Sequence, residues 1–177
     1  MIDKDCIFCK IANGEIPSAT VYEDADFRAI LDLGPASKGH TLILPKHHFK
    51  DLNEIDAETA AKVLPVAAKI GAAMKKGLGC AGYNVVQNNG TAAGQTVFHF
   101  HVHIIPRYEG GPTMVAWEPG SVSPEENAEI CEKIRGGNIR DARGRPRRGA
   151  GRTRQGNDRP GPFAGRQRRH AGARVPA

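Results

Sequence analysis

Three histidines stand at alternate positions in one apolar run of this 177-residue chain, Gln-Thr-Val-Phe-His-Phe-His-Val-His-Ile-Ile-Pro from Gln95 to Pro106. Side chains two residues apart point to the same face of a β-strand. The run therefore predicts a strand that carries His99, His101 and His103 in one row. Its opposite, apolar face would consist of Phe98, Phe100, Val102 and Ile104. Pro106 would end the strand, because proline cannot donate to a central ladder.

The remaining pattern predicts an α+β domain with an antiparallel sheet. Strands are expected where short apolar or β-branched runs lie between turn residues, over residues 19–23, 27–33, 41–44 and 82–87. The third of these runs is so compact and apolar that burial on both faces is expected. Apolar spacing and start signals predict a long helix over about 56–76, a short helix over 6–11 and a C-terminal helix from Ser123 to Gly136.

Composition indicates a soluble protein that is expected in the cytoplasm. No apolar stretch approaches the roughly 20 residues of a membrane span. The polar start, Met-Ile-Asp-Lys-Asp, is not followed by an apolar signal region. Four cysteines are too few for a disulfide scaffold. We therefore expect no membrane partner.

The net charge of +6 conceals a sharp division of the chain. From Arg135 onward there are 13 Arg, no Lys and two acids, a net charge of +11, whereas residues 1–134 carry −5. The basic residues therefore do not predict nucleic-acid binding by the folded part. Residues 137–177 are rich in Arg, Gly, Pro and Ala and bury too little apolar surface to offset their ordering entropy. We expect a domain over residues 1–136 and a disordered basic tail over 137–177.

Three interpretations of this tail stay open. It is a disordered segment without function, the product of an altered reading frame or acquired extension, or a basic arm that binds RNA or a membrane. The abrupt change from mostly Lys to only Arg favours a separate origin for the tail.

The histidine row has the residue types that phosphoryl transfer needs. A neutral imidazole, with an ordinary pKa of about 6.5, can attack phosphorus or accept a proton near neutral pH. His101, flanked on both sides, is the expected nucleophile, and its attack would give a covalent phospho-imidazole. Its far nitrogen must stay N–H, and the backbone carbonyl of His99 is the expected acceptor. His103 would protonate the leaving group or bind a phosphate oxygen.

The loop before the row offers donors for phosphate oxygens. Amide, hydroxyl and backbone N–H groups come from Asn88, Gly90, Gly94, Gln95 and Thr96. Glycine also lets the backbone approach a ligand closely. Asp32 lies at the end of the second expected strand, where it either accepts hydrogen bonds from ribose hydroxyls or forms a turn.

Several motifs resemble those of the histidine triad (HIT) family. The pattern His-φ-His-φ-His-φ-φ over residues 99–105, in which φ is apolar, is similar to the family signature. Further blocks in the family order are Cys-Ile-Phe-Cys-Lys-Ile at 6–11, Gly-Glu-Ile-Pro at 14–17, Leu-Asp-Leu at 31–33, Gly-His-Thr-Leu-Ile-Leu-Pro-Lys at 39–46 and Gly-Gln at 94–95. The resemblance covers about residues 5–135, and the most similar branch is that of the Hint-like bacterial HIT hydrolases.

The resemblance implies a HIT fold, a five-stranded antiparallel sheet with a long helix and a C-terminal helix, paired into a homodimer across the long helix and the sheet edge. It also implies a purine nucleotide substrate, such as an AMP derivative. The matching positions are a base pocket of Phe8, Ile11, Ile30 and Leu33, a ribose site at Asp32, and a phosphate site of Asn88, Gly94, Gln95, Thr96 and His103.

The same resemblance implies that His101 becomes nucleotidylated and that His40 supports the catalytic strand. Transferase and phosphorylase branches commonly carry Gln at the position of His103, so His103 favours a hydrolase that acts on nucleoside phosphoramidates or dinucleoside polyphosphates. Two other classes stay open. One is a nucleotide-binding regulatory or scaffold protein with incidental hydrolysis, and the other is a nucleic-acid repair deadenylase that uses the tail as a DNA arm.

A Cys-x-x-Cys pair, Cys6 and Cys9, suggests a structural zinc site, because zinc takes four nitrogen or sulfur ligands. In some bacterial relatives such a pair binds zinc together with two histidines. Alignment at Pro45-Lys46 implies that these are His48 and His99 here. A reduced thiol pair in a short helix and a redox motif are the alternatives.

Overall fold

The computed structural model of this protein describes residues 1–112 and 120–137. The chain divides into two units between residues 117 and 118, and each is considered by itself. The elements follow in the order α1 (Ile7–Ala12), β1 (Thr20–Glu23), β2 (Phe27–Leu31), β3 (Thr41–Pro45), α2 (Ala57–Leu78), β4 (Gly82–Val86), the short 3₁₀ helix η1 (Thr91–Ala93), β5 (Val102–Arg107) and α3 (Pro124–Gly136). Apart from Gly137, the tail for which disorder was expected lies outside the described residues.

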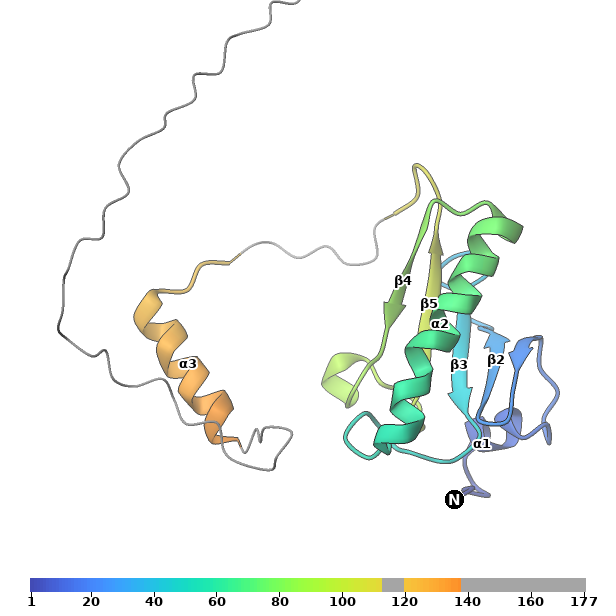
Figure 1. The fold of residues 1–177 in the computed structure, drawn as a ribbon, viewed down its shortest axis with the longest axis horizontal. Coiled ribbons are helices and arrows are strands. Elements are labelled where there is room, and N and C mark those ends of the chain that lie inside the picture. The colour runs from blue at the N-terminus through green and yellow to red at the C-terminus, as the bar shows by residue number, and fades with distance from the viewer. Residues whose placement is uncertain (113–119, 138–177) are drawn as a thin grey trace, which may run out of the picture. The chain divides into compact units, whose positions relative to one another are not determined.

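The first unit contains one five-stranded sheet in the order β1-β2-β3-β5-β4 (Figure 1). Every neighbouring pair in it is antiparallel. β1, β2 and β3 follow one another as a meander, and β4 reaches its place at the edge by pairing with the later strand β5. The predicted α+β class and the five-stranded antiparallel sheet are confirmed.

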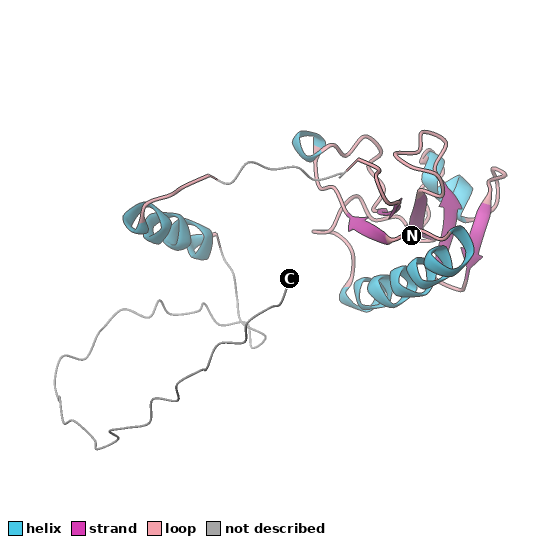
Figure 2. Ribbon diagram, turned by 90° about the horizontal axis from the view of Figure 1, so that it is seen from above, coloured by secondary structure: helices cyan, strands magenta, loops and turns pink. Residues whose placement is uncertain are grey.

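Helices cover both faces of this sheet, α2 on one side and the short α1 on the other (Figure 2). β3 is buried along its whole length, as expected. Its Ile43 packs into the larger apolar cluster beneath α2, and its Leu42 and Leu44 pack into the smaller cluster beneath α1. The central strands therefore join two apolar cores, and side chains of β5 that point away from α2 lie on the α1 side.

α2 begins and ends as the sequence indicates. Asp56 caps it by accepting a hydrogen bond from the Thr59 N–H at 2.8 Å, and Gly79 ends it with a φ of 67°, in the left-handed region. Its buried stripe is Val63, Val66, Ala67, Ile70, Gly71 and Met74. Leu64, whose apolar side chain and spacing from Ala60 and Ala67 would also place it in such a stripe, is 68% exposed. It lies about 100° around the helix from Val63 and faces away from the sheet.

The histidine run forms a strand only in its second half. β5 begins at Val102, so His99 and His101 precede the strand and only His103 lies within it. The preceding segment bends, and the Phe100 N–H donates to the Phe49 carbonyl rather than to a strand of the sheet. Phe98 is consequently 45% exposed instead of packed. The expectation of one continuous histidine strand is therefore wrong.

Pro106 does not end β5, which continues to Arg107. In a strand, the N and C=O of one residue point to the same side. The Pro106 carbonyl accepts a hydrogen bond from the Ser37 hydroxyl at 2.7 Å, on the side where β3 no longer pairs with β5. The missing N–H of Pro106 therefore costs no bond with β4, which explains why the strand tolerates it.

The second unit contains α3. Ser123 caps this helix by accepting from the Glu126 N–H at 3.1 Å, and Pro124 occupies its first position, as predicted. Among the helices in the described parts of the chain, none is both long and apolar enough to cross a membrane.

Gly71 and Gly77 form a matched pair of test positions on α2. A Cβ at Gly71 would overlap the ring of Tyr83 in β4, whereas a Cβ at Gly77 would meet nothing within 4 Å. We expect Gly71→Ala to lower the free energy of unfolding by about 1–3 kcal/mol through overpacking. Gly77→Ala should raise it by about 0.5–1 kcal/mol through helix propensity. Urea denaturation of both variants checks this, and equal changes of the same sign would contradict it.

Candidate active site

His101 is buried directly before β5 and has one defined tautomer. Its Nδ1 lies 2.6 Å from the carbonyl oxygen of His99, the acceptor expected from the sequence. Because a carbonyl oxygen only accepts, the hydrogen of the neutral ring is on Nδ1 and the lone pair is on Nε2. Burial lowers the pKa of His101, which keeps the ring neutral near pH 7. The ring is thus arranged as a nucleophile or a base.

His103 and His40 form a second pair beside it. The ring centroids of His101 and His103 are 5.0 Å apart, and Nδ1 of His103 lies 2.9 Å from Nε2 of His40. Burial, reinforced by the neighbouring His101 and His40, lowers the pKa of His103 to about 4. His40 is itself buried, with 5% of its surface exposed, although it directly follows the glycine of a loop.

Asp32 lies directly after β2 and faces the same group. Its Oδ1 accepts from the Gly34 N–H at 2.8 Å, and its Oδ2 lies 3.6 Å from Nδ1 of His40. The carboxylate also opposes the effect of burial on the pKa of His101. The turn interpretation is therefore confirmed, and the same side chain is within reach of the histidine group.

Apolar side chains from α1 and β2 border the histidines. The ring of Phe8 meets the ring of His101 edge-on, with centroids 5.1 Å apart. Phe8 and Ile11 both pack against the cluster that contains Ile30. Leu33 is fully exposed beyond the end of β2 and does not join this cluster, because the strand ends earlier than expected.

The loop over residues 88–96 encloses η1 between two glycines with positive φ, Gly90 and Gly94. Thr96 is exposed there, and Asn88 lies beside Gly94. Gln95 behaves differently from expectation. Its side chain is buried, donates to the Lys50 carbonyl at 2.7 Å and accepts from the Gly90 N–H at 2.8 Å. Its amide therefore holds the loop in shape, and its backbone N–H also bonds within the loop, to the Gly90 carbonyl at 3.1 Å. Both donors of Gln95 are thus engaged inside the protein.

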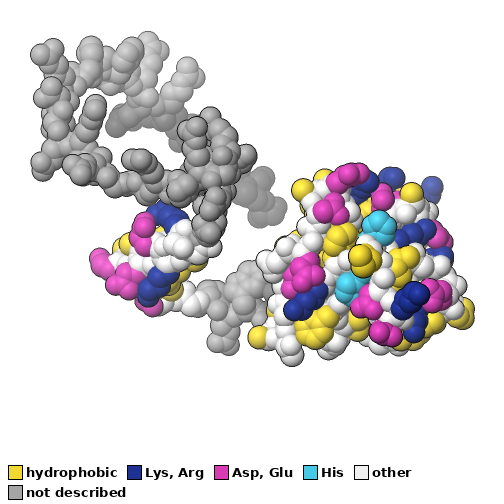
Figure 3. Space-filling model, turned by 90° about the horizontal axis from the view of Figure 1, so that it is seen from below, with side chains coloured by type: hydrophobic (Ala, Val, Ile, Leu, Met, Phe, Trp, Pro, Cys, Tyr) yellow, Lys and Arg dark blue, Asp and Glu magenta, His cyan; other side chains and the backbone are white. Residues whose placement is uncertain are grey.

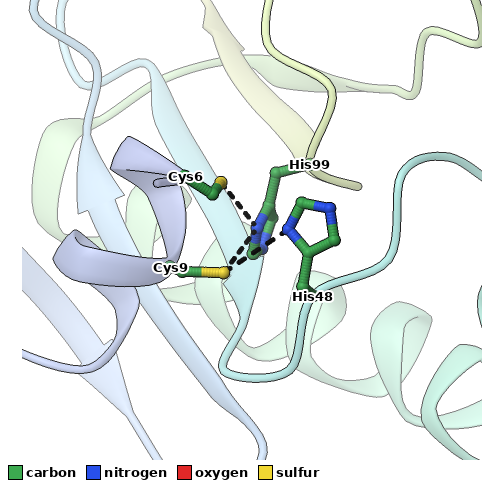
Figure 4. Close-up of side chains that lie close together, drawn as sticks. All are labelled: Cys6, Cys9, His48 and His99. Carbon is green, nitrogen blue, oxygen red and sulfur yellow. Dashed lines mark hydrogen bonds between the residues drawn. The ribbon is translucent and has the colours of Figure 1, made fainter. Parts of the chain in front are cut away.

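Cys6, Cys9, His48 and His99 converge at the start of α1, with their four ligand atoms within 4.8 Å of one another (Figure 4). Sγ of Cys6 lies 3.4 Å from Nδ1 of His99, and Sγ of Cys9 lies 3.4 Å from Nδ1 of His48. Ligands of a tetrahedral zinc ion, at about 2.3 Å for sulfur and 2.1 Å for nitrogen, lie about 3.6 Å apart. This metal cluster therefore has the donor set and the spacing of a structural zinc site.

A hydrogen bond on the side of the ring away from this cluster orients His99. Its Nε2 donates to the Pro45 carbonyl at 3.0 Å, which leaves the lone pair on Nδ1, toward the two sulfurs. Burial raises the pKa of Cys9 to about 11, so a bound cation would have to displace the thiol proton. The side-chain amide of Asn13 also connects α1 to the segment after β3, because it donates to the carbonyls of both Cys9 and Lys46.

Figure 3 shows histidine side chains at two places on one face of the first unit, between hydrophobic and acidic side chains. Several groups that orient the histidines are backbone atoms, namely the Pro45 carbonyl and the Ala36 N–H, which points to Nδ1 of His40. Because every residue has a backbone carbonyl, and every residue other than proline has a backbone N–H, no sequence signal could have identified these two groups. Asn13 is a supporting residue that the sequence motifs do not indicate, although an Asn directly after a Cys-containing helix can donate from its side-chain amide to backbone carbonyls.

Comparison with known proteins adds independent findings. A family model described as HIT domain matches residues 13–110. The adenosine 5′-monophosphoramidase of Schizosaccharomyces pombe is 43% identical over 130 residues, which cover 73% of this chain and 95% of the relative. The crystal structure of a HIT family protein from Bacillus subtilis has a TM-score of 0.69 at 42% identity and covers 74% of this chain and 95% of that one. A zinc-bound histidine triad family protein from Mycobacterium smegmatis has a TM-score of 0.59 at 36% identity, with 73% and 97% covered.

Proposed function

Because this chain belongs to the histidine triad family, we propose that it is a nucleotide hydrolase that cleaves at the α-phosphate of purine nucleoside phosphoramidates or dinucleoside polyphosphates. The observation that carries the proposal is the hydrogen bond from Nδ1 of His101 to the His99 carbonyl, which leaves Nε2 free to attack phosphorus. The S. pombe relative, named an adenosine 5′-monophosphoramidase, supports the same reaction class. Reduced Cys6 and Cys9 are compatible with a cytoplasmic location.

The reaction proceeds in two displacements at phosphorus. Nε2 of His101 forms a bond to the α-phosphorus while the bond to the leaving nitrogen or oxygen breaks, and the leaving group takes a proton from water. The nucleotidyl-imidazolium intermediate keeps its Nδ1–H on the His99 carbonyl. Water then attacks the same phosphorus, loses a proton to solvent and releases the nucleoside monophosphate with His101 restored.

His103 binds phosphate in this scheme rather than protonating the leaving group. With a pKa of about 4 it is neutral near pH 7, and a neutral imidazole donates a hydrogen bond more readily than it gives up its only N–H proton. The exposed Thr96 hydroxyl and the side-chain amide of Asn88, which lies beside Gly94, supply further donors. Asp32 binds the ribose hydroxyls, and the purine base lies against the apolar cluster of Phe8, Ile11 and Ile30.

We further propose that the metal cluster binds one structural zinc ion. Two thiolates and two imidazoles are a zinc ligand set, and the M. smegmatis structure, described as zinc-bound, supports this choice of metal. The ion would take no part in the chemistry. It would tie α1 to His48 and His99, and so fix the segment from which His101 projects.

We also propose a homodimer formed across β4 and α2. β4 is an edge strand, and an edge strand presents free backbone N–H and C=O groups to a second copy. Val85 on this strand and Leu64 on α2 are both exposed apolar side chains. A two-fold axis beside β4 would pair the edges and cover such side chains.

The test of the nucleophile is His101→Ala. We expect hydrolysis of adenosine phosphoramidate to fall by at least about a thousandfold, since the covalent route is lost, while AMP binding by calorimetry remains. His47→Ala, which removes an exposed histidine outside the group, is the matched control and should keep full activity. A His101→Ala variant with wild-type turnover would refute the assignment. Tight AMP binding without turnover in the wild type would favour the regulatory or scaffold alternative.

The zinc proposal is tested by metal analysis of the purified full chain. Wild type should contain about one zinc per chain, and Cys6→Ser should contain almost none, because three ligands with a weak hydroxyl hold zinc poorly. Cys131→Ser, at an exposed cysteine on α3, is the control and should keep the metal. Equal zinc in Cys6→Ser and wild type would exclude the site.

Light scattering tests the dimer. Wild type should show twice the 19.0 kDa mass of the chain, and Leu64→Glu should shift the population toward the monomer by placing a charge in the interface. Leu52→Glu, at an exposed leucine in the loop after β3, should leave the dimer unchanged. A monomer mass for wild type would contradict the proposal.

A further inference from the structure

Behind His103, a chain of three groups determines which ring nitrogen carries the proton. The Ala36 N–H lies 3.1 Å from Nδ1 of His40, and Nε2 of His40 lies 2.9 Å from Nδ1 of His103. A backbone N–H only donates, so Nδ1 of His40 accepts and the hydrogen of its neutral ring is on Nε2. That N–H donates to His103, which therefore carries its own hydrogen on Nε2.

The direction of this chain matters for phosphate binding. A His103 with hydrogen on Nε2 presents a donor on the side of the ring away from His40, as a phosphate oxygen requires. With the opposite tautomer it would present a lone pair there and repel that oxygen. The tautomer of His40 therefore decides whether His103 attracts or repels the substrate.

Asp32 competes for the same nitrogen of His40. Its Oδ2 lies 3.6 Å from Nδ1, and a closer approach would favour a hydrogen on Nδ1 and reverse the chain. The distance exceeds the range of a direct hydrogen bond, and Oδ1 of Asp32 is already held by the Gly34 N–H. The Ala36 N–H, and not Asp32, is therefore the partner of Nδ1 of His40 only while the backbone between Gly34 and His40 keeps its position.

Ser37 holds this backbone in place. Its hydroxyl donates to the Pro106 carbonyl at 2.7 Å, and its own carbonyl accepts from the His40 N–H at 3.0 Å. The first bond ties the loop to β5, the strand that carries His103, and the second ties it to His40. The carbonyl of the neighbouring residue Lys38 accepts a hydrogen bond at 2.9 Å from the hydroxyl of Tyr108, which directly follows β5.

We propose that Ser37 is a positioning residue that holds the Ala36 N–H on His40 and thereby fixes His103 as an Nε2–H donor to the substrate phosphate. The role in catalysis rests on the proposed hydrolase function, whereas the effect on the tautomers does not. The recorded hydrogen bonds of Ser37 are made to backbone groups and not to the histidine rings. It acts through two backbone groups, the Pro106 carbonyl and the Ala36 N–H.

The experiment compares Ser37→Ala with Ser37→Thr, which keeps the hydroxyl. Long-range proton–nitrogen NMR spectra of the full chain report the tautomers of His40 and His103 directly. We expect wild type and Ser37→Thr to show hydrogen on Nε2 of both rings. Ser37→Ala should show a mixture with the Nδ1 form, and its kcat/KM for adenosine phosphoramidate should fall about tenfold. Ser18→Ala, at a half-buried serine before β1 whose hydroxyl bonds to Thr20, is the matched control and should change neither measurement.

Two results would overturn the proposal. One is an unchanged pair of tautomers in Ser37→Ala, and the other is an equal loss of activity in Ser37→Ala and Ser37→Thr. If Ser37→Ala does not fold, Ser37→Cys, whose thiol is a weaker donor of similar shape, should show the same mixture, and unchanged tautomers there would also overturn it. If wild type lacks hydrolysis but Ser37→Ala shifts the tautomers, the hydrolase assignment fails and the positioning role stands.

Discussion

The hydrogen bond from Nδ1 of His101 to the carbonyl of His99 is the interaction on which the rest of the site depends. It selects the tautomer whose Nε2 can attack, and in a nucleotidylated ring it would become a bond from a cation to a carbonyl, which is stronger than its neutral counterpart. The bond exists because the chain bends before β5. In a regular strand, the carbonyl of His99 would point to a neighbouring strand. The bend before β5, which makes the prediction of a continuous strand wrong, instead leaves this carbonyl available as the acceptor for His101.

His99 therefore serves two sites at once. Its carbonyl orients His101, and its ring faces Cys6 and Cys9 while donating to the Pro45 carbonyl on β3. A proposed metal ligand and the acceptor for the proposed nucleophile, His101, are therefore parts of the same residue. Ordering that cluster restricts the backbone of His99, and the geometry of the nucleophile is thereby connected to α1 and β3 without a longer path. The N-terminal segment therefore helps to position His99, in addition to contributing side chains to the apolar core.

The elements of the fold follow from local signals, whereas several details of the site do not. Apolar spacing, the Asp56 cap and the Gly79 stop locate α2 within two residues, and the uninterrupted burial of β3 follows from its composition. The four residues of the metal cluster are also identified by residue type and resemblance. Apart from the bond between His101 and the His99 carbonyl, which the sequence predicted, the hydrogen-bond partners within the site could not be predicted from the sequence. The burial of Gln95 within its own loop depends on the Lys50 carbonyl, 45 residues away, and no pattern in the chain encodes that contact.

Electrostatics favour the arrangement of His40, His101 and His103 beside one carboxylate, that of Asp32. A nucleophilic ring must be neutral, and burial lowers the pKa values of His40, His101 and His103, which favours this state. Asp32 opposes it, since a carboxylate stabilises a neighbouring imidazolium. Its influence is limited because one oxygen is held by Gly34 and the other lies 3.6 Å from the nearest ring nitrogen. A second carboxylate close to these rings would favour protonation and remove the lone pair. In the proposed function, the site therefore uses one acid for a ribose and relies on neutral donors for the phosphate.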